Sequence, residues 1–391
     1  MSTEATRAPR ISAVLRQTER VTPLELFFDL VFVLALTQCT ALMAAEPTWT
    51  GLAKGLLVLG VLWWSWVGYA WLTSVVDPEE GAVRLVMFGA MAALLVVALC
   101  VPGAFGESAL LFACAYAVVR AAHIGLFIIA SRDDARFRQS VLGLAGGSAL
   151  GVGLLVAASG VDGWLQGALW GVALLLDVGE PFLFGAEGWR FVPHHFAERH
   201  GLILIIALGE SIVAIGVGAG AHVDAGVVAA ATLGIAVAAA IWWLYFDVVA
   251  LLSERDLAER APGRELNELA RDVYSLIHFP MVAGIVLAAL GLKTTIAHVG
   301  DPLDVVPATA LLGGTAMYLL AHVALRLRHI HTWNNHRLVF AVLVVALIPL
   351  AVGVPALVIL SVLAAVLWVL IGLEAKRFVG SRQRAREALA D

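Results

Sequence analysis

Seven ionisable side chains fall within long apolar stretches of the sequence or just inside their ends. Carboxylates and histidines in such low-dielectric surroundings can exchange protons near neutral pH, which suits proton coupling. We therefore treat the seven as a candidate site for substrate binding or proton coupling. They are Glu25, Asp29, Arg120, His123, Glu210, His278 and His322.

The spacing of these residues predicts how they lie relative to one another. Glu25 and Asp29 are four residues apart, which puts them on one face of a helix close to its start. Arg120 and Glu210 fall near the middle of their stretches, where a charge costs about 2.5 kcal/mol or more. Since an unpaired buried guanidinium is unfavourable, we expect Arg120 to pair with Glu210 or Asp29 in one continuous cavity. Buried pairs that only specify helix packing are the alternative.

The elements that must carry these residues are membrane-spanning helices. The chain of 391 residues is 61% hydrophobic and 14% charged, with a mean hydropathy of +0.91, which excludes a water-soluble fold. Apolar stretches recur, each close to the ~20 residues that a helix needs to cross ~30 Å of hydrocarbon. Backbone groups in lipid must be bonded within their own segment, so these stretches are helices. We count 12 of them, at 24–44, 51–72, 83–101, 108–131, 139–158, 162–180, 200–219, 226–251, 273–297, 303–327, 338–352 and 354–374.

Basic residues mark one side of the membrane. Of the 25 Lys and Arg residues, all but Lys54, Arg120 and Lys293 lie in the two tails or in every second connection between stretches. The intervening connections carry Asp and Glu instead. Because Lys and Arg near helix ends are retained in the cytoplasm, the basic connections and both termini are predicted to be cytoplasmic.

This orientation sets the expectations for the other polar residues. His278 and His322 fall in the inner third of their stretches, so the predicted cavity opens toward the cytoplasm. Two acidic residues of the sixth stretch, Asp177 and Glu180, lie near its inner end, and we expect them at a solvated boundary. The segment 253–272 alternates apolar and charged residues and predicts an amphipathic surface helix.

The two halves of the chain resemble each other. The aromatic run 63–66 in the second stretch is echoed by 242–245 in the eighth, and Glu25 parallels Glu198 at the start of the seventh. Six stretches separate each pair, which predicts two parallel six-helix bundles in tandem. The predicted organisation is a cytoplasmic tail (1–20), a first half (21–180), a cytoplasmic linker (181–199), a second half (200–374) and a cytoplasmic tail (375–391).

Three motifs occur in a characteristic order along the chain. TPLELFFDLVF opens the first stretch at residues 22–32, HFAERHG at 195–201 leads into ALGES at 207–211, and DVYS at 272–275 precedes HFP at 278–280. Together they resemble the bacterial low temperature requirement A (LtrA) family over nearly all of residues 20–375. The resemblance implies a multi-pass membrane protein, but it implies no substrate or reaction.

Three functions from different classes follow from these observations. A secondary, proton-coupled transporter of an unknown small solute fits the twelve stretches, the parallel halves and the charges near mid-membrane. An intramembrane redox or lipid-modifying enzyme using His123, His278 and His322 is the first alternative, and a bilayer-responsive sensor or scaffold is the second. A transporter is not an enzyme, so enzymatic activity is the less favoured reading. No Gly-x-x-x-x-Gly-Lys-Ser pattern occurs, which argues against a self-powered pump.

The partners expected from the sequence are membrane lipids of the bacterial inner membrane and the small solute, with no nucleic acid. Two histidine-rich segments, 194–200 and 328–337, raise the question of a metal site. Neither has the cysteine or carboxylate spacing that would complete one, so we expect no metal and no cofactor.

Overall fold

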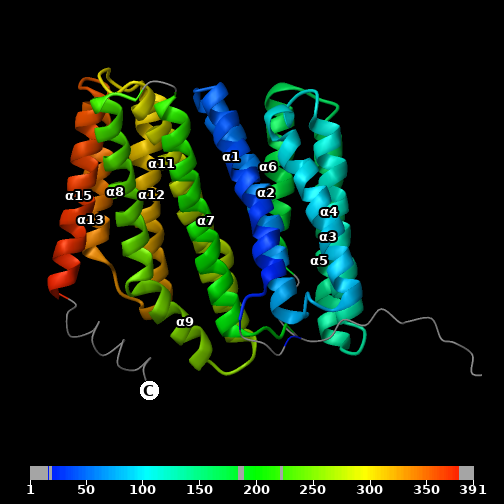
Figure 1. Ribbon diagram of the computed structural model, residues 1–391. Helices are drawn as coiled ribbons and strands as arrows, with labels where there is room; N and C mark the ends of the chain where they lie inside the picture. Colours follow the sequence, from blue (N-terminus) through cyan, green and yellow to red (C-terminus); the bar gives the residue numbers. More distant parts are fainter. Residues whose placement is uncertain (1–15, 17–19, 184–188, 221–222, 378–391) are drawn as a thin grey trace, which may run out of the picture.

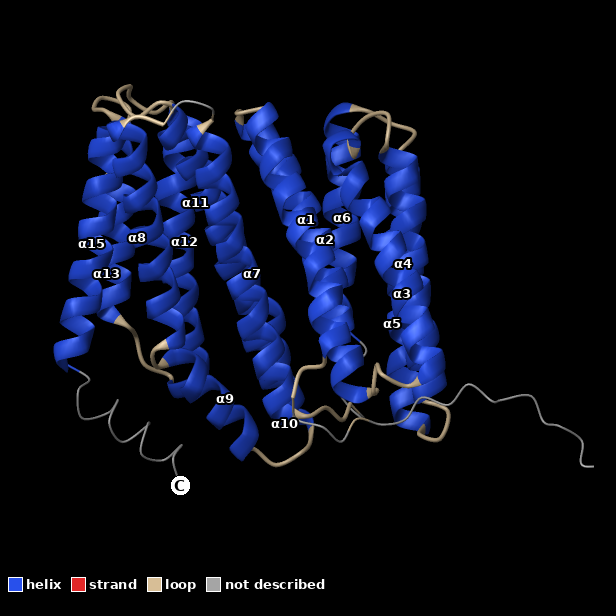
Figure 2. Ribbon diagram, viewed as in Figure 1, coloured by secondary structure: helices blue, strands red, loops and turns tan. Residues whose placement is uncertain are grey.

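The computed structural model describes residue 16 and residues 20–183, 189–220 and 223–377, most of which are helical. Figures 1 and 2 show the helices standing side by side along one direction. No strand occurs within the described ranges, and Pro302 and Pro355 form an isolated β-bridge. The predicted all-α helical bundle is therefore confirmed. Most of the two predicted tails and residues 184–188 of the predicted linker lie outside the described residues.

The first half of the bundle consists of long helices joined by short connections. They are α1 (Pro23–Ala45), α2 (Trp49–Val75), α3 (Gly81–Cys100), α4 (Ala109–Ala130), α5 (Ala135–Ala158) and α6 (Gly163–Leu183), with a 3-10 turn at Val101–Gly103. The second half combines long helices with shorter ones. They are α7 (Pro193–Ala219), α8 (Ala225–Phe246), α9 (Val249–Glu259), α10 (Arg264–Ala270), α11 (His278–Ala297), α12 (Val305–Ile330), α13 (Asn335–Ala346), α14 (Ile348–Ala351) and α15 (Ala356–Arg377).

Ten helical segments of the described chain are long and apolar enough to cross a membrane. The remaining two predicted stretches correspond to α6, of 21 residues, and to the shorter apolar segment Asn335–Ala351 formed by α13 and α14. Helices α6 and α13 run along the bundle with the others in Figure 1. Pro349 lies in the first turn of α14, and α15 follows after a short break, so the last two predicted stretches are separate helices.

The two ends of the bundle differ in charge. Helices α1 and α7 begin, and α15 ends, at the same end of the bundle (Figure 1). The connections after α2, α4, α6 and α12 lie there too, and arginines occur in them or in the adjoining helix ends: Arg84, Arg132, Arg136, Arg138, Arg190, Arg326, Arg328 and Arg337. We call this the arginine-rich end. Asp134 caps α5 there, and the backbone N–H groups of Phe137 and Arg136 hold the pKa of its carboxyl below the usual value.

The segment between α8 and α11 differs from the predicted single surface helix. It forms two short helices, α9 and α10, which are separated at Gly263. Gly263 has a φ of +151°, a conformation that residues with a Cβ rarely adopt, so the helix is interrupted at this position. A π-helical segment, Arg271–Ile277, then leads into α11.

The two halves share one pattern of neighbouring helices. In the first half, α1 packs on α2 and α3, α3 on α4, α4 on α5, α5 on α6, and α6 returns to α2. In the second half, α7 packs on α8 and α11, α11 on α12, α12 on α13, α13 on α15, and α15 returns to α8. The order of contacts is the same when the long helices are matched in sequence. A tandem repeat would produce this pattern, and the predicted duplication stays a prediction.

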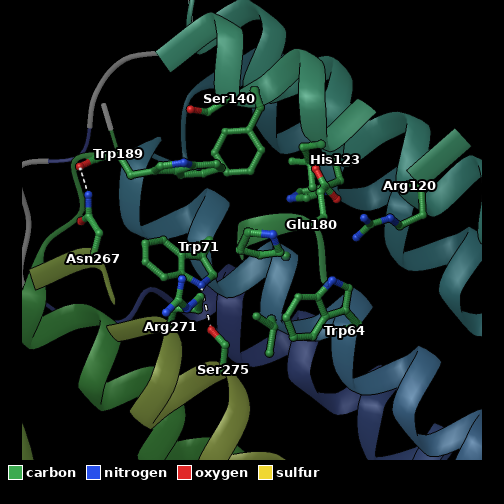
Figure 3. A pocket seen from close by; sticks show the side chains of 15 residues that line it. Trp64, Trp71, Arg120, His123, Ser140, Glu180, Trp189, Asn267, Arg271 and Ser275 are labelled. Carbon is green, nitrogen blue, oxygen red and sulfur yellow. Dashed lines mark hydrogen bonds between the residues drawn. The ribbon is translucent and has the colours of Figure 1, made fainter. Parts of the chain in front are cut away.

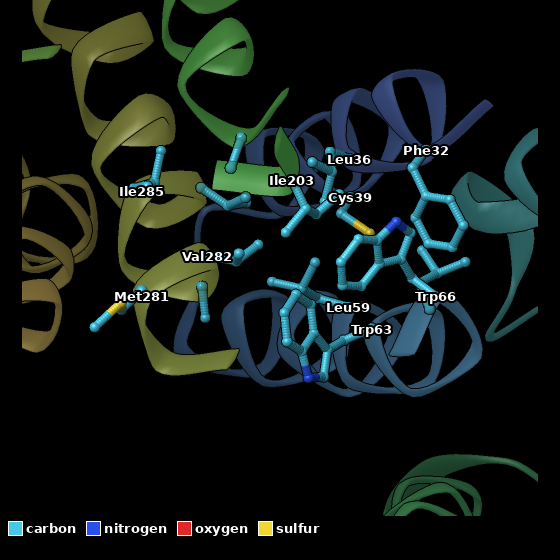
Figure 4. Packing of buried hydrophobic residues seen from close by; sticks show 14 of the residues in the cluster. Phe32, Leu36, Cys39, Leu59, Trp63, Trp66, Ile203, Met281, Val282 and Ile285 are labelled. Carbon is cyan, nitrogen blue, oxygen red and sulfur yellow. The ribbon is translucent and has the colours of Figure 1, made fainter. Parts of the chain in front are cut away.

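Apolar side chains of α1, α2, α7 and α11 join the two halves. Figure 4 shows this packing around Trp63, Trp66 and Ile203. Small residues bring helices of the second half especially close: a Cβ on Gly284 of α11 would lie 2.6 Å from the carbonyl oxygen of Gly314 on α12. Close approach through small residues is typical of helix packing in membranes.

Candidate functional site

The seven predicted site residues are all buried, but they lie in separate parts of the bundle. Glu25 and Asp29 sit between α1 and α7, Arg120 and His123 sit inside the first half, and His278 and His322 sit inside the second half, while Glu210 lies further along α7. None has more than 2% of its surface exposed. The structure thus does not bring them into the single continuous cavity expected from the sequence.

Glu25 is placed by the start of α1. The Thr22 hydroxyl accepts a hydrogen bond from the Glu25 backbone N–H at 3.4 Å, and the Glu25 carboxylate accepts one from the Thr22 N–H at 2.8 Å. This capping box, with Pro23 in the first turn, begins the helix and holds the carboxylate at its N-terminus. The first turn therefore directs Glu25 toward α7.

Two further side chains, Arg16 and His195, contact the Glu25 carboxylate. Arg16 donates to both of its oxygens at 3.2 Å and also to the carbonyl oxygen of Thr73 at 2.8 Å. His195 of α7 lies 2.8 Å from Glu25 through Nε2 and 2.8 Å from the Ser74 hydroxyl through Nδ1. Arg16, Glu25 and His195 have fully buried side chains. A segment before α1, the start of α7 and the end of α2 are thus joined through one carboxylate.

Asp29, one turn further along α1, is enclosed in the same way. Arg199 of α7 donates to Asp29 at 2.9 Å, and the Trp66 indole N–H donates to its other oxygen at 2.9 Å. The Arg199 guanidinium also lies over the Trp66 ring, 5.5 Å from the ring centroid, and donates to the carbonyl oxygen of Glu25 at 3.1 Å. Both side chains of the ion pair are 1% exposed.

We call Arg16, Glu25, Asp29, His195 and Arg199 the interhalf network. Its two α1–α7 pairs have the same sequence separation, because Glu25–His195 and Asp29–Arg199 are each 170 residues apart. Helices α1 and α7 therefore run parallel and in register at the arginine-rich end. With a neutral imidazole, two arginines and two carboxylates balance in charge, as a buried network requires.

Arg120 lies at one wall of a cavity inside the first half, which we call the first cavity (Figure 3). The cavity has a volume of about 90 Å³ and reaches from Arg120 and His123 to Trp189 and Asn267, which belong to the connections at the arginine-rich end. Asn267 donates to the Trp189 carbonyl oxygen at 3.2 Å, as Figure 3 shows. Residues from both halves therefore line this cavity.

The partner expected for Arg120 was wrong. Arg120 pairs with Asp177 of α6 at 3.4 Å and donates to the Ser148 hydroxyl of α5, not to Glu210 or Asp29. The second oxygen of Asp177 accepts a hydrogen bond from Tyr116 at 3.1 Å. Helix α4 packs among α2, α3 and α5 and not beside α7, which explains why Glu210 is out of reach.

The expected solvated position of the acidic residues on α6 was also wrong. Asp177 and Glu180 are 3% and 4% exposed, and Glu180 lines the first cavity. They are three residues apart, so both face α4 and α5 from one side of α6. Within the described part of the chain, Glu180 Oε2 and both ring nitrogens of His123 make no well-formed hydrogen bond. The His123 ring rests against the backbone at Gly68.

In the second half, both histidines are anchored on backbone carbonyls of nearby residues. His278 Nδ1 lies 2.8 Å from the Val273 carbonyl oxygen, and its Nε2 lies 2.9 Å from the Tyr245 hydroxyl. His322 Nδ1 lies 2.9 Å from the Tyr318 carbonyl oxygen, whereas its Nε2 has no hydrogen-bond partner among the described residues. His322 borders a second cavity, which has a volume of about 480 Å³.

Glu210 is held between α7 and α1. The Thr37 hydroxyl of α1 donates to its carboxylate at 2.6 Å, and the neighbouring Ser211 is also buried. The residue is thus a contact between the halves, separate from both cavities. Its role in substrate or proton handling stays a prediction.

Sequence reasoning assigned the partners of these residues to the surface. Arg16 and Arg199 were counted among the basic residues of a tail and a connection, and His195 was placed in a histidine-rich segment. However, Pro23 and Pro193 are also 170 positions apart and align Glu25 with His195 and Asp29 with Arg199. That alignment was the signal for the network. For Asp177 and Glu180, the signal was their spacing of three on an otherwise apolar helix.

Four histidines of the two histidine-rich segments have separate partners. His194 lies 2.9 Å from Glu254, His195 belongs to the interhalf network, and His200 binds the Phe196 carbonyl oxygen at 2.8 Å. His329 lies 2.6 Å from Asp256. Among the described residues, no group of three or more His, Cys, Asp or Glu side chains is arranged to hold a metal ion.

Comparisons with known proteins agree with the resemblance noted in the sequence. The family model described as bacterial low temperature requirement A protein (LtrA) matches residues 20–372. The chain is 29% identical over 308 residues to a protein of Rhizobium meliloti (strain 1021) named uncharacterized protein RA0937. That match covers 75% of this chain and 74% of the relative. No solved structure matches.

Proposed function

The chain belongs to the bacterial low temperature requirement A (LtrA) family, and we propose that this integral membrane protein is a proton-coupled secondary transporter of a small polar solute. In this proposal it lies in the bacterial inner membrane with the arginine-rich end in the cytoplasm, because Lys and Arg flanking spans are retained there.

The observation that carries the proposal is the lining of the first cavity. Ionisable groups within a membrane bundle are unfavourable, and they usually mark pathways for ions, protons or substrates. His123 and Glu180 combine deep burial with polar atoms that make no well-formed hydrogen bond to a described residue: the ring nitrogens of His123, which has a backbone contact at Gly68, and Oε2 of Glu180. Groups kept only for packing would be expected to have partners, as Asp29 does.

In this proposal the first cavity handles the coupled proton, because of its charged lining and its small size. Arg120 is held by Asp177 and lies beside Glu180 and His123, so a proton arriving on Glu180 changes the charge balance around a fixed guanidinium. A volume of about 90 Å³ is small beside the ~300–1,000 Å³ of typical ligand pockets. The first cavity therefore suits protons and water, and the solute occupies a larger space.

The interhalf network provides a fixed point for movement between the halves. Transporters built from two parallel bundles alternate access by rocking one bundle against the other. Here the in-register pairs of α1 and α7 hold the halves together at the arginine-rich end, while the first cavity is lined by both. Rocking about this contact would move the halves most at the end of the bundle opposite the arginine-rich end.

The proposal is tested in liposomes that contain the purified full chain and a trapped pH-sensitive dye. Amino acids, organic acids and amines are added singly, and at least one should drive proton movement that protein-free liposomes do not show. Glu180→Gln should abolish that proton movement but retain exchange of labelled solute, whereas Glu107→Gln, on an exposed loop, should behave as wild type. Wild-type proton coupling in Glu180→Gln, or no proton movement with any solute, would contradict the proposal.

A further inference from the structure

The second cavity is large enough for a small metabolite. It lies between α8, α9, α12, α13 and α15, in the half of the molecule opposite the first cavity (Figure 1). Its volume of about 480 Å³ falls within the ~300–1,000 Å³ range of small-molecule sites. Helices α8, α12, α13 and α15 hold the same places in the second half as α2, α4, α5 and α6, which surround most of the first cavity.

One wall of this cavity is basic. His322, Arg326 and His329 follow one another at spacings of four and three on α12, so they line the same face of the helix. Arg326 donates to the Thr332 hydroxyl at 3.1 Å and makes no ion pair with a described residue. His322, 2% exposed, directs no hydrogen bond from Nε2 to the described protein. Arg326 can receive the anionic part of a ligand, whereas His322 Nε2 can accept a hydrogen bond from a ligand, because Nδ1–H donates to the Tyr318 carbonyl oxygen.

The opposite wall is acidic. Asp247 follows α8, and Asp256 and Glu259 line the cavity from α9. Two pairs join the walls at its edges: His329 with Asp256 at 2.6 Å, and Arg337 of α13 with Glu374 of α15 at 2.9 Å. The Arg337–Glu374 pair is nearly buried, with side-chain exposures of 6% and 11%, and so gives the cavity a rigid side. Arg255 also lines this wall and pairs with Glu259, and Arg260 pairs with Asp256, so an ammonium group meets the carboxylate oxygens that these partly exposed ion pairs leave accessible.

Apolar side chains such as Trp243, Leu325 and Ile371 occupy the remaining surface. We propose that the second cavity binds a small zwitterion, whose anionic group contacts Arg326 and whose ammonium group faces His322 Nε2 and the carboxylates of Asp247, Asp256 and Glu259. As a transported solute, this ligand rests on the proposed transport function, but its binding is measurable without transport. A free metabolite and a zwitterionic lipid headgroup share this chemistry.

The test uses calorimetric titration of the purified full chain in detergent with leucine and with phosphoethanolamine. Matched ligands lacking one charge are leucine amide and N-acetyl-leucine. At least one zwitterion should bind, and each singly charged derivative should bind at least tenfold more weakly. If the singly charged derivatives bind as tightly as leucine, the inference is overturned. If neither zwitterion binds, it is overturned unless a lipid headgroup already occupies the site. That case is decided with the Leu325→Cys variant in nanodiscs. Phosphatidylethanolamine should protect the new thiol from a thiol reagent, and phosphatidylglycerol should not. Equal labelling in the two lipids overturns the inference.

Variants locate the binding. Arg326→Gln should weaken zwitterion binding at least tenfold, while Arg328→Gln, which removes the pair with Asp272 outside the cavity, should leave it unchanged. Equal effects of the two variants would refute the site. Because binding and transport are measured separately, zwitterion binding without proton movement would refute only the transport proposal. Coupled transport without zwitterion binding would refute only this inference.

Discussion

Removing Arg199 should destabilise the protein more than any other single change in the interhalf network. Its guanidinium pairs with Asp29 at 2.9 Å, donates to the Glu25 carbonyl oxygen at 3.1 Å and lies over Trp66. Arg199→Met keeps most of the apolar stem and removes all three interactions. The Asp29 carboxylate then keeps the Trp66 indole N–H but has no cation at hydrogen-bonding distance.

The size of the effect follows from burial. Both members of the pair are 1% exposed, so water cannot replace the lost partner, and breaking such a pair typically costs about 3–5 kcal/mol. Replacing both members is much less damaging, because no unpaired charge is left behind. Arg199→Met combined with Asp29→Asn should therefore recover most of the loss, since the Asn side-chain oxygen still accepts from Trp66.

The assay is reversible unfolding in mixed detergent micelles, followed by tryptophan fluorescence for the wild type, both single variants and the double variant. A double-mutant cycle then gives the coupling energy between the two side chains. The reasoning is refuted if the free energy of unfolding of Arg199→Met lies within about 0.5 kcal/mol of the wild-type value, which is the usual range for surface substitutions. It is equally refuted if the two single effects simply add.

Three further changes test orientation, cavity and interhelical contact. Reporter fusions after residues 160 and 300 should lie outside the cytoplasm, and fusions after 135, 265 and 385 should lie inside it. A cytoplasmic reporter signal after residue 300 would contradict the predicted orientation. Gly68→Ala would place a Cβ 2.9 Å from His123 Cε1, so solute-driven proton movement should fall in liposomes, while Gly125→Ala, with no atom within 4 Å, serves as the neutral control. Glu210→Gln should abolish transport in the same assay but leave the protein folded, because Thr37 can still donate to the amide oxygen; full transport would reduce Glu210 to a packing residue.

The architecture was predictable because the membrane constrains it so strongly. Span length, apolar composition and the alternation of basic connections each follow from the thickness and chemistry of the bilayer. The break near Pro349 could likewise be located, since proline cannot continue a helix without losing a hydrogen bond. The division of 253–272 into two helices was missed, because the φ of +151° at Gly263 has no periodic signature.

The partners of the buried charges were harder to predict. Depth along a helix can be read from the sequence, but rotation around the helix axis and the choice of neighbouring helix cannot. Arg120 and Glu210 share a similar depth, yet α4 contacts α2, α3 and α5 while α7 contacts α1, α8 and α11. Asp177 was available at a compatible depth but was assigned to the boundary because of its position near the end of a stretch.

The in-register pairing of α1 and α7 bears on how such a molecule acquires buried charge. If the halves arose by duplication, α1 and α7 would have begun as identical helices meeting across a twofold axis, where any charged residue faces its own copy. Like charges in a buried contact are unfavourable, so a stable contact requires the two copies to diverge into opposite or hydrogen-bonding types. When Pro23 is aligned with Pro193, in place of the Glu25–Glu198 match suggested by the sequence, Glu25 stands opposite His195 and Asp29 opposite Arg199, each at a separation of 170 residues. A gene duplication would thus permit a charged interhalf contact that a symmetric pair of identical helices could not hold.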